Sequence, residues 1–223
     1  MIFAAGLVAG TMNAFVGSGS LITFPTLLAL GYPPMVANVS NTIGLVPGSI
    51  SGAIGYREKL AGLSGMIWRL VPWCAAGALL GGGLLLALPA AVFEAVVVAL
   101  IALAILLVLV QPRIMRGRRE RGEAPRHVRW TLLALLFGTS MYGGYFGAAQ
   151  GVLFIAVLGI LVTDDLHVAN AMKNVLAAVV NGAAALLFVI AARPDAAVAG
   201  LIAAGSLIGG HVGARVGQRL PPL

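Results

Sequence analysis

Long runs of apolar residues fill most of this sequence and exclude any fold that water surrounds. Only 9% of the 223 residues are charged and 60% are hydrophobic, whereas a water-soluble domain needs a far more polar exterior. Seven long apolar runs cover approximately residues 1–16, 36–56, 65–88, 91–110, 130–147, 168–191 and 196–217. The sequence therefore predicts an all-α, polytopic helical bundle in a membrane, and water-soluble enzyme folds are excluded.

Two shorter apolar runs, 20–31 and 151–162, contain twelve residues each. As helices they would reach only about 18 Å, against roughly 30 Å for the hydrocarbon core of a bilayer. We therefore expect short broken helices or parts of re-entrant hairpins. Non-helical backbone at membrane depth survives only where protein covers it or where it lines a cavity, so these breaks are candidate substrate sites.

The net charge of +7 is concentrated in one stretch between two apolar runs. Seven of the fourteen basic residues lie in this stretch: Arg113, Arg116, Arg118, Arg119, Arg121, Arg126 and Arg129. The positive-inside rule makes residues 111–129 a cytoplasmic loop, which also suits contact with anionic lipid headgroups. A nucleic-acid partner is not expected, because no folded basic domain accompanies the cluster.

An internal repeat relates the two halves of the chain. The motif Met35-Val-Ala-Asn-Val-Ser-Asn-Thr42 aligns with His167-Val-Ala-Asn-Ala-Met-Lys-Asn174 at an offset of 132 (169 − 37 = 132), and the same offset places Gly19 on Gly151 without a gap. Four polar positions recur at this offset: Asn38, Asn41, Thr42 and Ser49 in the first half, and Asn170, Lys173, Asn174 and Asn181 in the second. Each set lies near one helical face, and in a bilayer such a face meets protein or water.

The two repeats are expected to have opposite orientations in the membrane. An odd number of crossings separates them, whether the short runs cross the membrane or turn back within it. Inverted repeats with broken helices are typical of secondary transporters. We divide the chain into a first membrane repeat (1–110), the basic cytoplasmic loop (111–129) and a second membrane repeat (130–223).

Two blocks of sequence occupy corresponding places in these repeats. The first is Gly17-Ser-Gly-Ser-Leu-Ile-Thr-Phe-Pro-Thr-Leu-Leu-Ala-Leu-Gly31, continued by residues 32–42 and by 47–57. The second is Gly143-Gly-Tyr-Phe-Gly-Ala-Ala-Gln-Gly151, with residues 170–174 and Asn181. Over most of its length the chain resembles the sulfite exporter TauE/SafE family of bacterial membrane permeases. The resemblance implies transport of sulfite, sulfoacetate and related organosulfur or organic anions across the bacterial inner membrane, driven by ion gradients.

The sequence departs from this family in two respects. The family's glycine run after the first helix is here Gly-Ser-Gly-Ser, so that Ser18 and Ser20 add hydroxyl groups. The first repeat also contains the apolar run 91–110, and the second repeat has no counterpart of it after 196–217. Either the sequence is truncated or that helix is dispensable.

The candidate anion site lies at the start of the two short runs. The turn at residues 17–20 opens the first run and the turn at 148–151 opens the second. Helix N-termini present unpaired N–H groups and about half a positive charge, which suits an anion. If inverted symmetry brings both turns to mid-membrane, they face one another across a cavity, with Ser18, Ser20 and Gln150 as further donors. Alternatively, the glycines only permit tight turns and close packing.

Lys173 is the only basic residue well inside an apolar run. It either neutralises an anionic substrate, loses its proton during transport, or extends to water at the nearby cytoplasmic end. The amide side chains of the repeated motif either line the pathway or bond neighbouring helices. The candidate substrate-binding residues are Gly17, Ser18, Gly19, Ser20, Asn38, Asn41, Thr42, Gln150, Gly151, Asn170, Lys173, Asn174 and Asn181.

The leading functional hypothesis is a secondary carrier that exports a small anion by alternating access between inverted halves. The expected partners are the anionic substrate, the lipid bilayer and a coupling proton or sodium ion; a homodimer is an open alternative to a monomer. A passive anion channel and a non-transporting membrane scaffold are the alternative functions. An enzyme is not expected and neither a cofactor nor a metal is predicted, because the sequence lacks a Ser–His, paired-acid or His-cluster arrangement and a GxxxxGK loop.

Overall fold

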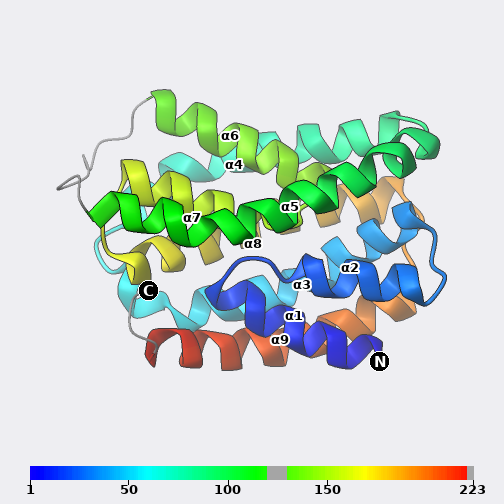
Figure 1. The fold of residues 1–223 in the computed structure, drawn as a ribbon, viewed down its shortest axis with the longest axis horizontal. Coiled ribbons are helices and arrows are strands. Elements are labelled where there is room, and N and C mark those ends of the chain that lie inside the picture. Colours follow the sequence, from blue (N-terminus) through cyan, green and yellow to red (C-terminus); the bar gives the residue numbers. More distant parts are fainter. Residues whose placement is uncertain (120–129, 220–223) are drawn as a thin grey trace.

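The computed structural model describes residues 1–119 and 130–219, and its regular elements in these ranges are all helical (Figure 1). They are α1 (Ile2–Phe15), α2 (Ser20–Ala29), α3 (Pro34–Gly55), the short 3-10 helix η1 (Arg57–Leu60), α4 (Ser64–Ala87), α5 (Ala90–Arg119), α6 (Trp130–Tyr145), α7 (Gln150–Leu161), α8 (Leu166–Ala191) and α9 (Ala196–Arg219). Within the described residues, four stretches are long and apolar enough to cross a membrane, namely α4, Ala90–Val110 of α5, α8 and α9. The predicted all-α, polytopic membrane bundle is confirmed.

The helix α5 extends further than the sequence predicted. The basic loop was expected to begin at residue 111, but α5 continues to Arg119. Arginine, glutamine and methionine are good helix formers, so the helix continues beyond the end of the apolar run. The rest of the predicted loop, residues 120–129, lies outside the described part of the chain.

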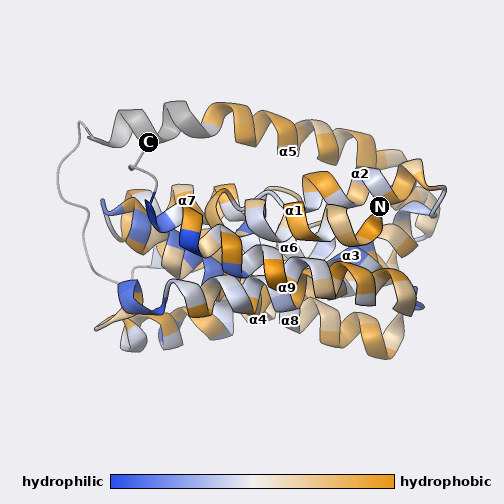
Figure 2. Cartoon of the chain, turned by 90° about the horizontal axis from the view of Figure 1, so that it is seen from below, coloured by the Kyte–Doolittle hydropathy of each residue, from blue (hydrophilic) through white to orange (hydrophobic). Residues whose placement is uncertain are grey.

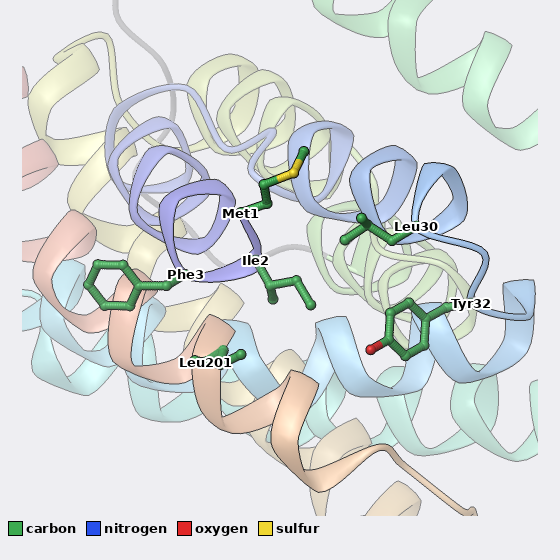
Figure 3. A pocket seen from close by; sticks show the side chains of 6 residues that line it. All are labelled: Met1, Ile2, Phe3, Leu30, Tyr32 and Leu201. Atoms are coloured by element: carbon green, nitrogen blue, oxygen red, sulfur yellow. The ribbon is translucent and has the colours of Figure 1, made fainter.

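The helices α1 and α2 form a hairpin that turns back before it reaches the far end of the bundle. They have 14 and 10 residues, and the chain reverses at Gly17, whose φ is 87°. Met1 and Ile2 at the start of α1 line the same pocket as Leu30 and Tyr32, which follow α2 (Figure 3). Both open ends of this hairpin therefore lie at one end of the bundle.

The helices α6 and α7 form a second hairpin with the same local structure. The N–H of Gly147 bonds the carbonyl of Tyr142, as the N–H of Gly17 bonds that of Met12. Gly147 also has a positive φ, of 75°. Because a positive φ is strained for residues with a Cβ, glycine is the residue expected at both reversals.

The second hairpin opens toward the opposite end of the bundle from the first. Leu132 near the start of α6 and Leu158 near the end of α7 share one apolar cluster with Ile67 and Leu70 of α4. This part of α4 lies at the basic end of the bundle, which we define by Arg57, Lys59, Arg69, Arg215 and Arg219 on η1, α4 and α9. Figure 2 shows hydrophilic residues gathered at one end of the helices.

Hydrogen bonds fix the directions of the long helices. The backbone N–H of Asp195, just before α9, bonds the hydroxyl of Ser40 near the start of α3. At their other ends, the Gln218 side chain of α9 bonds the carbonyl of Gly55. The helices α3 and α9 therefore run parallel to one another.

Glycines let two further pairs of helices approach until their backbones touch. On α9, Gly209 faces the backbone of Leu7 of α1. On α4, Gly77 faces the backbone of Phe137 of α6. One turn further along, Gly213 faces Thr11 and Gly81 faces Met141. Both pairs are parallel, because the contacts advance in the same direction on both helices.

These matched contacts correct the alignment of the two halves. The residue numbers of Gly77 and Gly209 differ by the predicted offset (209 − 77 = 132). The numbers of the residues they face, Leu7 and Phe137, differ by two fewer (137 − 7 = 130). The hairpin turns also follow the smaller offset, since Gly147 plays the part of Gly17 (147 − 17 = 130). The gapless alignment that placed Gly19 on Gly151 is therefore wrong in the hairpins, because the second half has two extra residues between its hairpin and α8.

We predict that Gly77→Leu and Gly209→Leu each lower the melting temperature of the detergent-solubilised protein by several degrees, because overpacking a tight contact typically costs about 1–3 kcal/mol. Gly83→Leu is the control, since Gly83 lies on α4 with open space around its Cα. The melting temperature is measured from the protein that remains folded after heating, as monitored by size-exclusion chromatography. Equal melting temperatures for the three variants would show that these helix contacts are not tight.

Candidate functional site

The two hairpin turns meet inside the bundle. The N–H of Gly151, at the start of α7, donates a hydrogen bond of 3.1 Å to the carbonyl of Gly17. A Cβ on either glycine would collide with the backbone of the other. We expected the turns to face one another across a cavity, and in this structure they are in direct contact.

The second turn contains a residue in an unfavourable backbone conformation. Ala149 precedes α7, is fully buried and has φ 57°. The left-handed region costs a residue with a Cβ about 1–2 kcal/mol. Such conformations persist only where the surrounding structure imposes them, and they concentrate at functional sites.

Two helices begin where the turns meet, and both begin without a side-chain cap. Gly19 precedes α2 and Ala149 precedes α7, and neither has a side chain that accepts a bond from the first turn. Ser18, Ser20 and Gln150 lie at these starts and are buried. The helix starts therefore offer polar groups and the positive end of two helix dipoles away from water.

Lys173 of α8 lies directly beside the meeting point. Its side chain is fully buried, and a methylene group lies close to the Cα of Gly17. The Nζ donates hydrogen bonds to the carbonyls of Asn13 (2.6 Å) and Ala14 (3.2 Å), in the last turn of α1. Lys173 therefore does not extend to water at the basic end, because its amine is bound inside the protein.

Asparagines hold the end of each broken helix from the other half of the chain. Asn170 and Asn174 of α8 both donate to the carbonyl of Ala14, over 3.1 and 2.9 Å. In the mirrored arrangement, Asn38 of α3 donates to the carbonyl of Tyr145 at the end of α6, over 2.9 Å. Asn38 and Asn170 thus each bond the carbonyl end of a helix that stops inside the bundle.

The other repeated polar residues bond neighbouring helices. Asn41 donates to the hydroxyl of Ser20 and accepts from Thr23, which ties α3 to α2. Asn181 donates to Ser49 over 3.1 Å where α8 crosses α3. The hydroxyl of Thr42 bonds its own helix at the carbonyl of Asn38.

The structure thus brings most of the candidate residues together around the turns, and all thirteen are buried. Gly17, Gly151, Lys173, Asn170 and Asn174 surround the end of α1. Gly19 packs against the backbone of Ala9, which agrees with the packing interpretation for this glycine. Asn181 reaches this region through Ser49, whose hydroxyl also accepts from Asn13 in the last turn of α1.

Asn13 is a polar residue of this region that the sequence analysis missed. Its carbonyl binds Lys173 and its side chain donates to Ser49 over 3.2 Å. An amide inside the apolar run 1–16 was the available signal, because polar side chains at membrane depth usually face protein or a cavity.

Three candidate residues keep a buried side-chain oxygen without a hydrogen-bond partner. They are Asn38, Gln150 and Asn170, and the neighbour of the Asn170 side chain is the buried hydroxyl of Tyr56, which also lacks a partner. Buried polar atoms without a protein partner mark places where water or a ligand supplies the missing group. Among the residues that the structure describes, no group of three or more His, Cys, Asp or Glu side chains could hold a metal ion.

A pocket of about 420 Å³ lies elsewhere, at the open end of the first hairpin. Met1, Ile2, Phe3, Leu30, Tyr32 and Leu201 line it (Figure 3). These side chains are almost entirely apolar and come from α1, α9 and the segment after α2. The pocket does not contain any of the thirteen candidate residues.

Comparisons with known proteins agree with the resemblance of the sequence blocks. A protein of Haemophilus influenzae described as "Probable membrane transporter protein" is 29% identical over 216 residues, which are 97% of this chain and 84% of the relative. "Probable membrane transporter protein YfcA" of Escherichia coli strain K12 is 28% identical over 223 residues, 99% of this chain and 79% of the relative. No solved structure matches the chain significantly. Residues 2–223 match the family described as "Sulfite exporter TauE/SafE", and the chain therefore belongs to this family of membrane transporters.

Proposed function

We propose that this protein is a secondary carrier that moves small anions, of the class of sulfite and organic sulfonates, out of the cell by alternating access. The observation that carries the proposal is the meeting of two hairpins from opposite ends of the bundle at Gly17 and Gly151, beside the buried Lys173. The family description, which names sulfite export, supports the substrate class and the direction.

The packing supports an inverted relation between the two halves. The helices α1, α3 and α9 run in one direction, while α8 runs against α3, since Asn174 near the start of α8 lies beside Gly52 near the end of α3. The contacts of α1 with α9 are matched by those of α6 with α4 at constant offsets. Two halves related in this way can exchange outward-facing and inward-facing conformations, which is the basis of alternating access.

Three groups at the meeting point attract an anion, and amide and amine donors cap the neighbouring carbonyl ends of α1 and α6, which would repel one. The starts of α2 and α7 contribute the positive ends of two helix dipoles, and Lys173 contributes an amine beside Gly17. Ser18, Ser20 and Gln150 add polar groups that can contact the oxygens of a sulfite or sulfonate group. Among the described residues, every Asp and Glu side chain is at least partly exposed, so none is buried with the two turns.

The burial of the candidate residues favours a carrier over a passive channel. All thirteen are buried, and the two turns bond one another directly. A channel needs a continuous lining that water reaches from both sides. A carrier instead opens its site to one side at a time, and the structure fits a closed state in which an anion enters after one hairpin moves.

The orientation we propose places the basic end in the cytoplasm of a bacterial cell, with the protein in the inner membrane. Lys59, Arg69 and Arg215 lie at this end, as the positive-inside rule requires. The first hairpin then opens toward the outside and the second toward the cytoplasm.

Lys173→Met is predicted to slow anion uptake into proteoliposomes by roughly tenfold or more, because hydrogen bonds from charged donors are worth about 1.5–3 kcal/mol. The assay follows labelled sulfite or a labelled sulfonate under an imposed ion gradient. Lys59→Met is the matched control, since Lys59 is the other lysine of the chain and is exposed on η1. Equal uptake by the wild type, Lys173→Met and Lys59→Met would show that Lys173 takes no part in transport. If the folded wild-type protein transports no anion, the proposed transport function is contradicted.

Asn38→Ala is predicted to destabilise the protein by about 1–3 kcal/mol, because it leaves the carbonyl of Tyr145 without its side-chain donor. Asn170→Ala should cost less, because the carbonyl of Ala14 keeps Lys173 and Asn174 as donors. Their melting temperatures in detergent test the mirrored roles of the two asparagines. Thr42→Ala is the control, because the Thr42 hydroxyl bonds only its own helix. A larger loss for Asn170→Ala than for Asn38→Ala would contradict these roles of the two asparagines.

A further inference from the structure

We infer that the last carbonyl groups of α1 form a cation site, which the ammonium group of Lys173 fills as a cation tethered to α8. This inference goes beyond the proposed function, because it concerns how the broken helix is stabilised, whichever molecule is transported. It assigns a ligand class, a small monovalent cation or a primary ammonium group, to a site made by the backbone of Asn13 and Ala14.

The end of α1 supplies negative partial charge beside Lys173. The last carbonyls of a helix lack intrahelical donors and together carry about half a negative charge. The carbonyls of Asn13 and Ala14 lie in the last turn of α1, and Lys173 bonds both. The carbonyl ends of broken helices inside a membrane are known to coordinate small cations.

Among the described residues, the fully buried Lys173 has no carboxylate partner. Lys173 has no exposed surface, whereas each carboxylate that the structure describes is at least partly exposed. A buried charge is stable only where opposite charge or oriented dipoles compensate for its lost hydration. At this site the compensating group is the end of α1.

The end of α6 is bonded without a lysine. The carbonyl of Tyr145 at the end of α6 accepts from the neutral Asn38 side chain. The position that corresponds to Lys173 is Asn41 (173 − 132 = 41), and its amide contacts Ser20 and Thr23 of α2 instead. The end of α6 is therefore bonded by an amide alone, whereas the end of α1 also binds the amine of Lys173.

The consequence is that a free cation has no room at the end of α1 while Lys173 is bound there. Removing the side chain beyond its Cβ leaves the carbonyl of Asn13 without its side-chain donor, while that of Ala14 keeps the amides of Asn170 and Asn174. A small cation from solution then fits, and it stabilises the folded protein in proportion to its concentration.

The test compares melting temperatures of purified Lys173→Ala and wild-type protein in equal concentrations of choline, sodium and ethylammonium chloride. We expect the wild type to unfold at one temperature in all three salts. Lys173→Ala should unfold several degrees lower in choline chloride and recover in ethylammonium or sodium chloride, because choline is too bulky for the site. Lys173→Met, whose side chain occupies the space without a charge, should be destabilised and show no recovery.

A melting temperature of Lys173→Ala that is the same in all three salts would overturn the inference. If this variant does not fold in any salt, Lys173→Gln decides the matter, because glutamine is a neutral donor of similar length. A melting temperature of Lys173→Gln equal to that of the wild type would also overturn the inference, and a lower one supports it. These readouts do not involve flux, so they stand or fall separately from the proposed transport.

Discussion

The need to satisfy backbone groups at the ends of helices that stop inside the bundle governs this structure. A helix end at membrane depth has no water to bond its free carbonyls and N–H groups, and each unsatisfied group costs several kcal/mol. Here the donors come from the opposite half of the chain, from Asn170, Lys173 and Asn174 to α1 and from Asn38 to α6. Each broken helix therefore depends on a long helix from a distant part of the sequence.

This dependence also links stability to the proposed transport. The groups that cap α1 lie beside the place where the turns meet, so a hairpin cannot move away without exchanging those hydrogen bonds for others. The unpartnered oxygens of Asn38, Gln150 and Asn170 are the available acceptors for such an exchange. A state in which the turns separate would open a polar space between the starts of α2 and α7.

The sequence predicted the helices well because apolar runs in a membrane protein end where polar residues, proline and glycine begin. Both short runs became α2 and α7, and the polar residues of α3 and α8 are buried as their spacing indicated. The partners of these residues could not be predicted, since they depend on which helix ends meet in space. The two extra residues before α8 were also invisible, because the motifs around Asn38 and Asn170 align without them.

Cysteine labelling from the two sides of the membrane tests the central claim most directly. Pro33 follows the first hairpin and Asp164 follows the second, and both are exposed. In a background in which the buried Cys74 is replaced by alanine, we expect a membrane-impermeant thiol reagent to label Pro33→Cys only from the outside and Asp164→Cys only from the cytoplasmic side. Labelling of both cysteines from one side would contradict hairpins that enter from opposite faces.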